Sequence, residues 1–361
     1  MKLLKRITKS PSRPGGYTPL KNKLNGNQKE SLKKAEIPSV SVIIVNYKLA
    51  EEIKKHISIL FEEDIPIEVI IVDNSESEEQ RKILYALTKK LPIKLIVNQK
   101  NLGFGCACNV ALLQSRGKYI FFLNPDAYIT KGSLKKLFLF AEKYKIDAAG
   151  PRIYLDDSLS IKQPPFYPPL FITTIFHNLF PNIFSKWWRK YSYKFWKNKK
   201  PFEVNFLSGA AFLIKRELAG FDNRFFMYFE DADLFMRLKK LSKKFFLYPD
   251  ASVVHKFDLS PSSKKNTFFE RSKQKFYAKH YPLLKHIIDL SEKHKKFYIY
   301  PGARPIEYFL ENKSTQELEI ALSGDFVPFV RARLDYNNLP SFIERKKKLL
   351  IARKRSKGNS D

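Results

Sequence analysis

The segment "YFEDADLF", residues 228–235, places three carboxylates, Glu230, Asp231 and Asp233, inside a strongly apolar stretch. A carboxylate beside apolar bulk loses hydration, which costs roughly several kcal/mol for each unpaired charge. One explanation is structural: apolar residues recur at helical spacing after Asp231, and acids at a helix start stabilise its free N–H groups. Asp233 would then pair with Arg237 one turn later. A helix cap needs only one acid, so the other acids indicate chemistry.

Three more polar residues stand where buried strands are predicted to end, namely Asp73 in "VDNS", Asp126 in "NPDA" and His255 in "ASVVH". Each alone is equally typical of a turn-forming aspartate or a packed histidine. Together, carboxylate and imidazole suit a divalent cation such as Mn²⁺ or Mg²⁺. A cation with few protein ligands can bind phosphate oxygens, while a separate carboxylate removes a proton from a hydroxyl. This set is typical of group transfer from a nucleotide diphosphate.

The first part of the chain alternates predicted strands with predicted helices. β-Branched runs predict buried strands at 40–47, 67–75, 93–99 and 118–127, and amphipathic stretches predict helices at 49–62, 78–90, 102–116 and 131–144. This alternation predicts an α/β fold with a mostly parallel, doubly wound sheet. Ligands of such sheets bind beyond the carboxyl ends of the strands. We therefore expect one crevice at the residues that follow these ends: Asn46, Tyr47, Asp73, Asn101 and Asp126.

The second part adds predicted strands at 204–217 and 244–257 and helices over 266–298. Composition divides the whole chain further. We expect a basic flexible arm at 1–37, a domain at 38–265 with an aromatic and basic insertion at 163–200, a helical and mixed extension at 266–345, and a basic tail at 346–361.

The motifs, in their order along the chain, resemble the inverting glycosyltransferases of family 2, within the rhamnosyltransferase-like branch. The resemblance covers about residues 40–280 and implies the GT-A fold with a C-terminal helical extension. It is carried by "SVIIVNYK" (41–48), "IIVDNS" (70–75), "NLGFGCACNVAL" (101–112), "FLNPDA" (122–127), "LSGAAFLIKRE" (207–217), "GFDNRFFMYFEDADLFMRL" (220–238) and "YPDASVVH" (248–255).

On the donor side, the resemblance implies a role for several residues at the strand ends. Tyr47 and Asp73 match residues that meet the nucleobase, and Asn101 and Gly103 match part of the same pocket. Asn124 stands where the family places the first acid of its Asp-x-Asp element, which leaves the part of Asn124 in metal binding open.

On the catalytic side, the resemblance implies that Asp126 and His255 bind the metal. Asp231 matches the catalytic base, and Glu230 beside it matches an acceptor-side group. An aspartate with an ordinary pKa of about 3.9 is ionised at neutral pH and can accept the proton of a hydroxyl.

The implied reaction passes a sugar to a hydroxyl of a glycan or lipid-linked acceptor during synthesis of a cell-surface polysaccharide. Rhamnose from dTDP-rhamnose is one donor, and a UDP-hexose or UDP-hexosamine is the alternative. The sequence leaves this choice open, because sugar specificity rests on loop contacts.

The net charge of +30 raises a different possibility, a protein that binds nucleic acid. The basic residues concentrate outside the predicted crevice, and no nucleic-acid module is visible, so we disfavour it. Residues 171–200 combine apolar side chains, tryptophans and lysines, which fits contact with an anionic membrane surface and fits equally an aromatic lid on the acceptor side with a solvated basic face. Two cysteines, and a start without an apolar signal core, lead us to expect a cytoplasmic protein at the inner face of the membrane.

Overall fold

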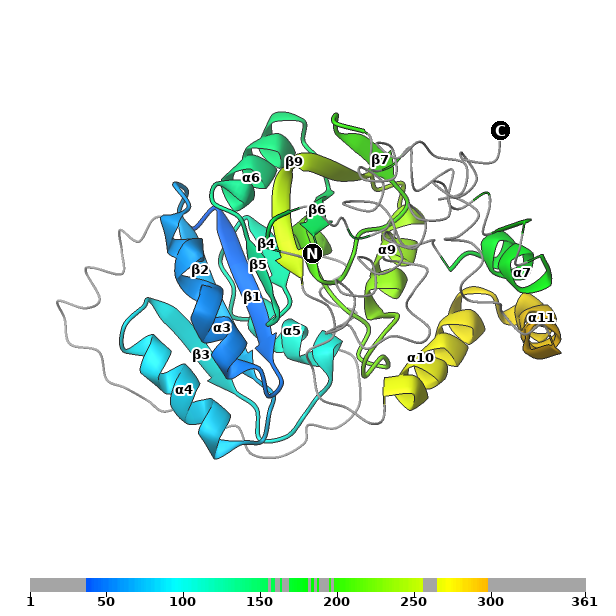
Figure 1. The fold of residues 1–361 in the computed structure, drawn as a ribbon, viewed down its shortest axis with the longest axis horizontal. Helices are drawn as coiled ribbons and strands as arrows, with labels where there is room; N and C mark the ends of the chain where they lie inside the picture. Colours follow the sequence, from blue (N-terminus) through cyan, green and yellow to red (C-terminus); the bar gives the residue numbers. More distant parts are fainter. Residues whose placement is uncertain are drawn as a thin grey trace, which may run out of the picture.

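The structure is a computed structural model, and it describes residues 37–154, 157–159, 163, 169–180, 183–184, 187, 195, 198–255 and 265–297. Within these residues nine strands form one sheet, in the order β3-β2-β1-β4-β8-β6-β9-β5, with β7 paired to β9 (Figure 1). The predicted arm at 1–37, apart from Ile37, and the predicted tail at 346–361 lie outside the described residues, as does the extension beyond 297.

The first half of the sheet consists of four parallel strands: β1 (Val40–Asn46), β2 (Ile67–Asp73), β3 (Ile93–Val97) and β4 (Tyr119–Leu123). Every residue of β1 and β4 is buried, because helices cover both faces of the sheet. This confirms the four predicted strands. The β1–β2 register aligns Asn46 with Asp73, so two of the predicted site residues are neighbours at the carboxyl edge.

Two groups of helices cover the two faces of the sheet. One apolar core includes residues of α3 (Ala50–His56), α4 (Glu78–Thr88) and α6 (Ser133–Lys143). The other includes residues of α5 (Phe104–Leu112) and α9 (Glu230–Lys239). The predicted doubly wound arrangement is therefore confirmed. The helix predicted at 49–62 is shorter than expected, since a 3-10 helix, η1 (Ile57–Glu62), replaces its second half.

The second half of the sheet is mixed. β6 (Ala148–Tyr154) and β9 (Phe245–His255) run parallel to the first four strands, whereas β8 (Ala211–Lys215), β5 (Ala127–Ile129) and β7 (Phe202–Val204) run in the opposite direction. The single strand predicted at 204–217 is thus two strands, β7 and β8, which the segment 205–210 separates. β6 was not predicted, because Gly150 and Pro151 interrupt its apolar pattern.

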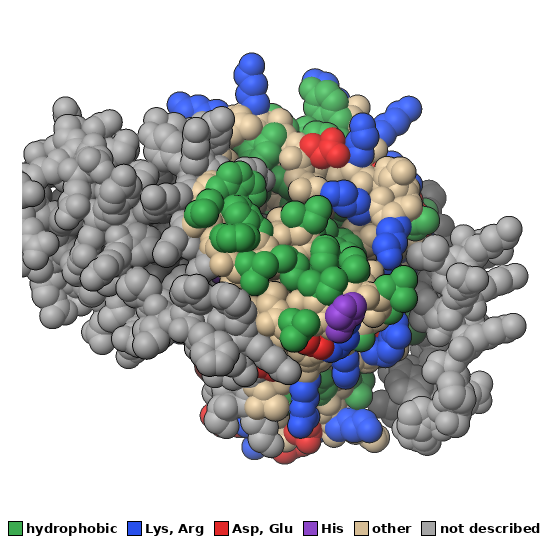
Figure 2. Space-filling model, turned by 90° about the vertical axis from the view of Figure 1, so that its right-hand side faces the viewer, with side chains coloured by type: hydrophobic (Ala, Val, Ile, Leu, Met, Phe, Trp, Pro, Cys, Tyr) green, Lys and Arg blue, Asp and Glu red, His purple; other side chains and the backbone are tan. Residues whose placement is uncertain are grey.

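The C-terminal part of the described chain is helical, as predicted for 266–298. Pro282 separates α10 (Lys265–His280) from α11 (Lys285–Phe297), with a short 3-10 turn, η3 (Pro282–Leu284), between them. The side chains of α10 pack on α9, and α7 (Phe171–Leu179) packs beside α11 (Figure 1). Figure 2 views the molecule from this side.

Candidate active site

The acidic segment begins with a strained turn just before α9, which we term the acid turn. Tyr228 and Phe229 have φ values of 67° and 65°, in the left-handed region that costs a residue with a side chain roughly 1–2 kcal/mol. The turn ends where α9 begins, so it places Glu230 and Asp231 in the first turn of that helix. Strain of this kind persists only where the surrounding structure holds it.

One face of α10 holds this turn through hydrogen bonds to its backbone. Ser272 Oγ donates to the carbonyl oxygen of Met227 at 2.7 Å, and Lys275 Nζ donates to that of Arg224 at 2.9 Å. One turn further along, Lys279 Nζ lies 2.6 Å from a carboxylate oxygen of Asp222. These α10 residues are three and four positions apart, so they share one side of the helix.

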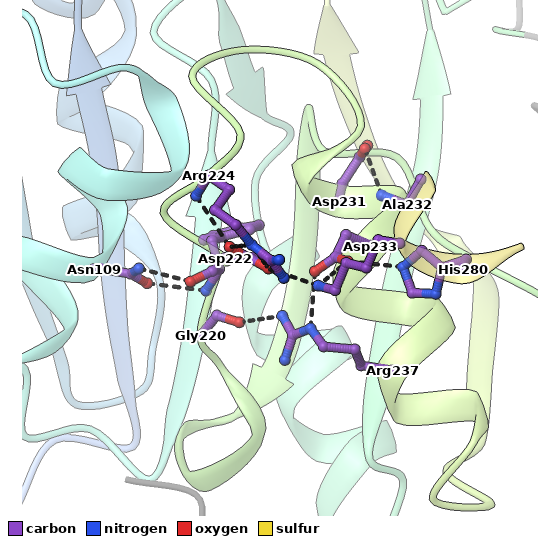
Figure 3. Close-up of polar contacts among 11 residues, drawn as sticks. Asn109, Gly220, Asp222, Arg224, Asp231, Ala232, Asp233, Arg237 and His280 are labelled. Carbon is purple, nitrogen blue, oxygen red and sulfur yellow. Dashed lines mark hydrogen bonds and ion pairs between the residues drawn. The ribbon is translucent and has the colours of Figure 1, made fainter. Parts of the chain in front are cut away.

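Asp233 is fully buried and anchors α9 to α10. Its carboxylate accepts a hydrogen bond from Arg237 Nε at 2.8 Å, lies 2.8 Å from His280 Nε2, and also contacts Lys279. Figure 3 shows the Arg237 and His280 side chains pointing toward it. Burial alone would raise the pKa of Asp233, but hydrogen bonds from His280 and Lys279 and the charge of Arg237 hold it below its usual value. The expected pairing with Arg237 is confirmed.

Asp231 points away from this anchor, toward the segment that precedes β8. Its Oδ2 accepts a hydrogen bond from the backbone N–H of Gly209 at 3.0 Å. Its Oδ1 accepts one from the N–H of Ala232 at 2.7 Å, which Figure 3 shows. Burial raises the pKa of Asp231, while these two bonds oppose the rise. The predicted value near 3.9 is therefore too low, because the sequence does not reveal this burial.

Glu230 is in a different environment, although it is the adjacent residue. Its side chain is buried, its β-carbon lies near Gly105 of α5, and its Oε2 has no hydrogen-bond partner among the described residues. Burial, with the nearby charge of Asp231, raises the pKa of Glu230 to about 8. Burial therefore favours the neutral form of Glu230, whereas the N–H groups of Gly209 and Ala232 stabilise the charged form of Asp231.

The pairing of β5 with β9 brings Asp126 and His255 together. Ala127, the first residue of β5, is the register partner of His255, and His255 Nε2 lies 3.2 Å from Asp126 Oδ1. Both side chains are largely buried. The neighbouring Asn124 donates its backbone N–H to the carbonyl oxygen of Ala210 at 2.9 Å. Asn124, two residues before Asp126, is thus bonded to Ala210, and the preceding residue, Gly209, donates its N–H to Asp231.

The Asp126–His255 pair has the chemistry of a divalent cation site. Carboxylate oxygen and imidazole nitrogen are ligands that Mn²⁺ accepts, and they are in contact here. Among the described residues there is no cluster of three or more His, Cys, Asp or Glu that could hold a metal without other ligands. The two residues therefore fit a cation that takes its remaining ligands from a bound diphosphate and water.

Asn46 and Asp73 lie side by side at the carboxyl ends of β1 and β2. Asn46 Nδ2 donates to Asp73 Oδ1 at 3.0 Å, and the same oxygen accepts from Ser75 Oγ at 2.6 Å. The Asn46 side chain also accepts from the N–H of Leu49, at the start of α3. Both side chains are buried, whereas Tyr47 is half-buried. Asn46 and Asp73 thus fix the strand ends beside Tyr47.

Asn101 and Gly103 belong to a second set of contacts around Asn74. Asn74 Nδ2 donates to Asn101 Oδ1 at 2.8 Å, and that oxygen also accepts from the N–H of Gly103 at 2.9 Å. Asn74 Oδ1 accepts from Asn98 Nδ2 and from the N–H of Leu102, both at 3.0 Å. Asn74 was not among the predicted site residues. It stands directly after Asp73 at a strand end, and this position is the signal that could have identified it.

Gly103 connects this donor-side region to the acidic segment. It has a φ of 80°, and a β-carbon built on it would lie 2.1 Å from the carbonyl oxygen of Phe226. Phe104 donates its N–H to that same oxygen at 3.0 Å. The close approach requires glycine, because any side chain would push the Phe226 segment away. Gly209, whose N–H holds Asp231, is a further site residue that the sequence reasoning did not select.

The sequence matches the family model described as Glycosyl transferase family 2 over residues 41–220. The chain belongs to glycosyltransferase family 2. Its sheet, with helices on both faces and a reversed strand next to β4, is consistent with the GT-A fold that the motifs predicted. The chain is therefore a glycosyltransferase, of the rhamnosyltransferase-like branch.

Curated relatives of this glycosyltransferase include enzymes named for different sugars. The N-acetylglucosaminyl-diphospho-decaprenol L-rhamnosyltransferase of Mycobacterium tuberculosis is 26% identical over 235 residues, which cover 59% of this chain and 75% of that protein. The poly(ribitol-phosphate) beta-N-acetylglucosaminyltransferase TarS of Staphylococcus aureus is 31% identical over 111 residues, which cover 30% of this chain and 19% of that protein.

Solved structures with a similar fold were also found. S. aureus TarS 1–349 in complex with UDP is 17% identical, and the match covers 88% of this glycosyltransferase and 91% of that chain with a TM-score of 0.46. The mannosyltransferase PcManGT from Pyrobaculum calidifontis, in complex with GDP-Man and Mn²⁺, is 15% identical, with coverages of 89% and 92% and a TM-score of 0.47. In the part of the chain that the structure describes, no helix is long and apolar enough to span a bilayer.

Proposed function

We propose that this chain is a metal-dependent, inverting glycosyltransferase that builds a cell-surface polysaccharide. It transfers rhamnose from dTDP-rhamnose to a hydroxyl of a glycan or lipid-linked acceptor. The observation that carries this proposal is the placement of Asp231. Its carboxylate is held by two backbone N–H groups at the start of α9, and one of these donors, Gly209, precedes Ala210, whose carbonyl oxygen bonds to Asn124, two residues before Asp126.

Asp231 acts as the general base in this proposal. An acceptor hydroxyl is a weak nucleophile until its proton is being removed, and a positioned base contributes about 10²–10⁴-fold to the rate. The pKa of Asp231 is raised by burial, which makes it a stronger base than an exposed aspartate, and its two N–H donors favour its ionised form. A single displacement by the activated hydroxyl inverts the anomeric carbon of the transferred sugar.

Glu230 acts on the acceptor side and does not remove the proton. With a pKa near 8 it is neutral at neutral pH, so its carboxyl group can donate a hydrogen bond to a sugar hydroxyl. Because Glu230 is neutral, there is no second negative charge beside Asp231. Such a charge would repel the negatively charged donor.

Asp126 and His255 would hold Mn²⁺ or Mg²⁺ between the acid turn and the donor diphosphate. When bound, the cation would neutralise the charge that develops on the departing diphosphate. Asn124 supports the site through its backbone bond to Ala210, and the position of its side chain at the end of β4 suits contact with the donor.

The nucleotide part of the donor would bind at the carboxyl ends of β1 and β2. Tyr47 and Asp73 would meet the nucleobase, Asn46 would hold Asp73, and Asn101 with Gly103 would form the adjoining wall. A UDP-hexosamine donor is the second candidate, favoured by the 31% identity to an N-acetylglucosaminyltransferase. A thermal-shift screen of dTDP-rhamnose, UDP-glucose and UDP-N-acetylglucosamine, each with and without Mn²⁺, distinguishes the two.

The catalytic assignment is tested with two conservative variants. Asp231→Asn keeps the shape of the side chain and removes its basicity, so donor binding by calorimetry should remain while single-turnover transfer falls at least about a hundredfold. Glu230→Gln is the matched control at the adjacent position, and it should mainly raise the acceptor KM. Transfer by Asp231→Asn within a few-fold of the wild-type rate would refute the proposal.

The proposed reaction takes place in the cytoplasm, at the inner face of the membrane, where a lipid-linked acceptor would be available. The charge of the chain, +30, suits a peripheral position on anionic lipid.

A further inference from the structure

The buried side of helix α7 includes two polar residues. Thr174 and Asn178 form hydrogen bonds with Tyr277 Oη of α10 at 2.8 Å and with Ser291 Oγ of α11 at 3.0 Å, while Phe171 and Ile175 pack on the apolar cluster beside them. Ile172, on the same helix, is 77% exposed. The exposed side of a surface helix in a water-soluble domain is normally polar, so an exposed isoleucine there is notable.

The neighbouring helix also presents apolar residues outward. Leu283 of η3 is 86% exposed and Leu290 of α11 is 60% exposed, while Ile288 and Ser291 face inward. Because α7 and α11 pack against each other, their outward residues form one surface, which we term the α7–α11 face. Its members are Ile172, Phe180, Ile183, Trp187, Leu283 and Leu290. Figure 2 shows hydrophobic side chains gathered on this side of the molecule, with lysine and arginine side chains around them.

The composition of the sequence that includes and follows α7 indicates the kind of partner. Residues 171–200 contain seven lysines and arginines and no acid, and all three tryptophans of the chain lie among them. The acids of α11 that the structure describes are paired, Asp289 with Lys285 and Glu292 with Lys273. Large exposed apolar side chains, in a stretch of sequence rich in tryptophan, lysine and arginine, match the headgroup region of an anionic bilayer. A protein partner would also cover the apolar residues, but the excess of positive charge is not needed to bind an apolar protein surface.

The α7–α11 face is joined rigidly to the acid turn. Tyr277 of α10 bonds to Thr174 of α7, while Ser272, Lys275 and Lys279 of the same helix hold the turn that precedes Asp231. A bilayer in contact with the face would therefore lie at a fixed distance from Asp231. An acceptor anchored in that bilayer would meet the base without any large movement of the protein.

We propose that the α7–α11 face binds the surface of an anionic bilayer and that the enzyme takes its acceptor from that bilayer, as a sugar on a lipid anchor. The choice of acceptor rests on the proposed function, whereas membrane binding does not.

Flotation of the full chain with vesicles tests the face directly. The wild-type protein should float with phosphatidylcholine vesicles that contain about 30% phosphatidylglycerol, which imitate an anionic membrane. It should largely fail to float with vesicles of pure phosphatidylcholine. The double variant Leu283→Ser, Leu290→Ser should lower the recovered fraction at least about fivefold. The matched control is Leu113→Ser, Leu139→Ser, since these leucines are 78% and 50% exposed outside the face, and it should float like the wild type.

Three outcomes would overturn the membrane assignment. The first is that the wild type does not float with anionic vesicles. The second is that the control variant loses as much flotation as the face variant. The third is that neither protein floats while light scattering shows a wild-type dimer that the face variant abolishes. Unfolding temperatures of both variants confirm that each is folded. Because flotation needs no donor, a chain that floats but transfers no sugar refutes the proposed function alone.

A paired activity measurement tests the acceptor. The face variant should lose at least about fivefold in transfer to a lipid-linked acceptor in vesicles, and should keep its transfer rate to a short soluble acceptor. An equal loss on both acceptors would show that the face does not select the acceptor.

Discussion

The contact between Gly103 and the carbonyl oxygen of Phe226 gives a sharp prediction about how the acid turn is positioned. Gly103→Ala changes no group that reacts, yet the added methyl would lie 2.1 Å from that oxygen. Contacts below 3.0 Å are essentially never seen for a real β-carbon, so the Phe226 segment must move by roughly 1 Å. This segment leads directly into Tyr228, Phe229 and the first turn of α9.

The expected size of the effect follows from two separate costs. Gly103 has a φ of 80° and a ψ of 168°, a backbone conformation essentially confined to glycine, so alanine there costs about 1–3 kcal/mol. Displacement of packed backbone adds about 1–2 kcal/mol, so the free energy of unfolding should fall by about 2–5 kcal/mol. A shift of about 1 Å in a catalytic group can reduce the rate by about a hundredfold. We therefore expect kcat to fall by about 10- to 100-fold.

Gly132→Ala is a control for a positive φ without a steric contact. Gly132 has a φ of 75° and a ψ of 1°, in the left-handed helical region, and a β-carbon there would have no atom within 4 Å. This variant should lose about 1–2 kcal/mol of stability and keep kcat within about twofold. Urea unfolding gives the stabilities, and sugar transfer below the onset of unfolding gives the rates. If Gly103→Ala behaves like Gly132→Ala in both measurements, Gly103 does not set the position of the acid turn.

Three further predictions concern the metal, the acid pair and α10. Asp126→Ala should abolish the increase in donor affinity that Mn²⁺ produces in calorimetry, and full wild-type activity in EDTA would contradict the metal proposal. Because the folded-state pKa of Glu230 is raised from 4.5 to about 8, its contribution to stability is present below pH 4.5 and is lost as pH rises toward 8. Glu230→Gln cannot ionise, so at pH 9 it should be more stable than the wild type, by up to a few kcal/mol, and at pH 4 it should be equal; the same pH dependence in both proteins would refute this. Lys279→Met should cost about 1–3 kcal/mol in urea unfolding, because buried Asp233 loses a charged partner, whereas Lys285→Met, which breaks an exposed ion pair within α11, should cost under about 1 kcal/mol; equal losses would contradict the anchoring role of Asp233.

The sequence predicted the first half of the fold well, because the buried strands there are continuous β-branched runs. β1 and β2 needed no tertiary information to be recognised. β6 escaped prediction, since its apolar pattern contains Gly150 and Pro151, and only the pairing with β8 and β9 makes it a strand. The break between β7 and β8 was missed for a related reason, because residues 205–210 are apolar enough to continue a strand.

The candidate site was predicted by residue type at strand ends, and its electrostatics were not. Placing Asp126 next to His255 follows from strand order, but the burial that separates the pKa of Glu230 from that of Asp231 depends on packing. Nothing in a local sequence pattern indicates that Tyr228 and Phe229 adopt left-handed conformations, since bulky aromatic residues rarely do. That geometry exists because α10, far away in sequence, holds the turn.

The reversal of β8 has a consequence for the kind of group that reaches the ligand edge. In a wholly parallel sheet, that edge receives only the last residues of each strand, whose outgoing peptide units present carbonyl oxygens. A strand that runs in the opposite direction has its first residues at that edge instead. The N–H groups just before the strand are not bonded to a neighbouring strand. The N–H of Gly209, two residues before β8, is such a group, and it donates a hydrogen bond to Asp231. Inverting one strand thus supplies the Asp231 carboxylate with a hydrogen-bond donor that belongs to the main chain, which among the natural residues only proline would lack.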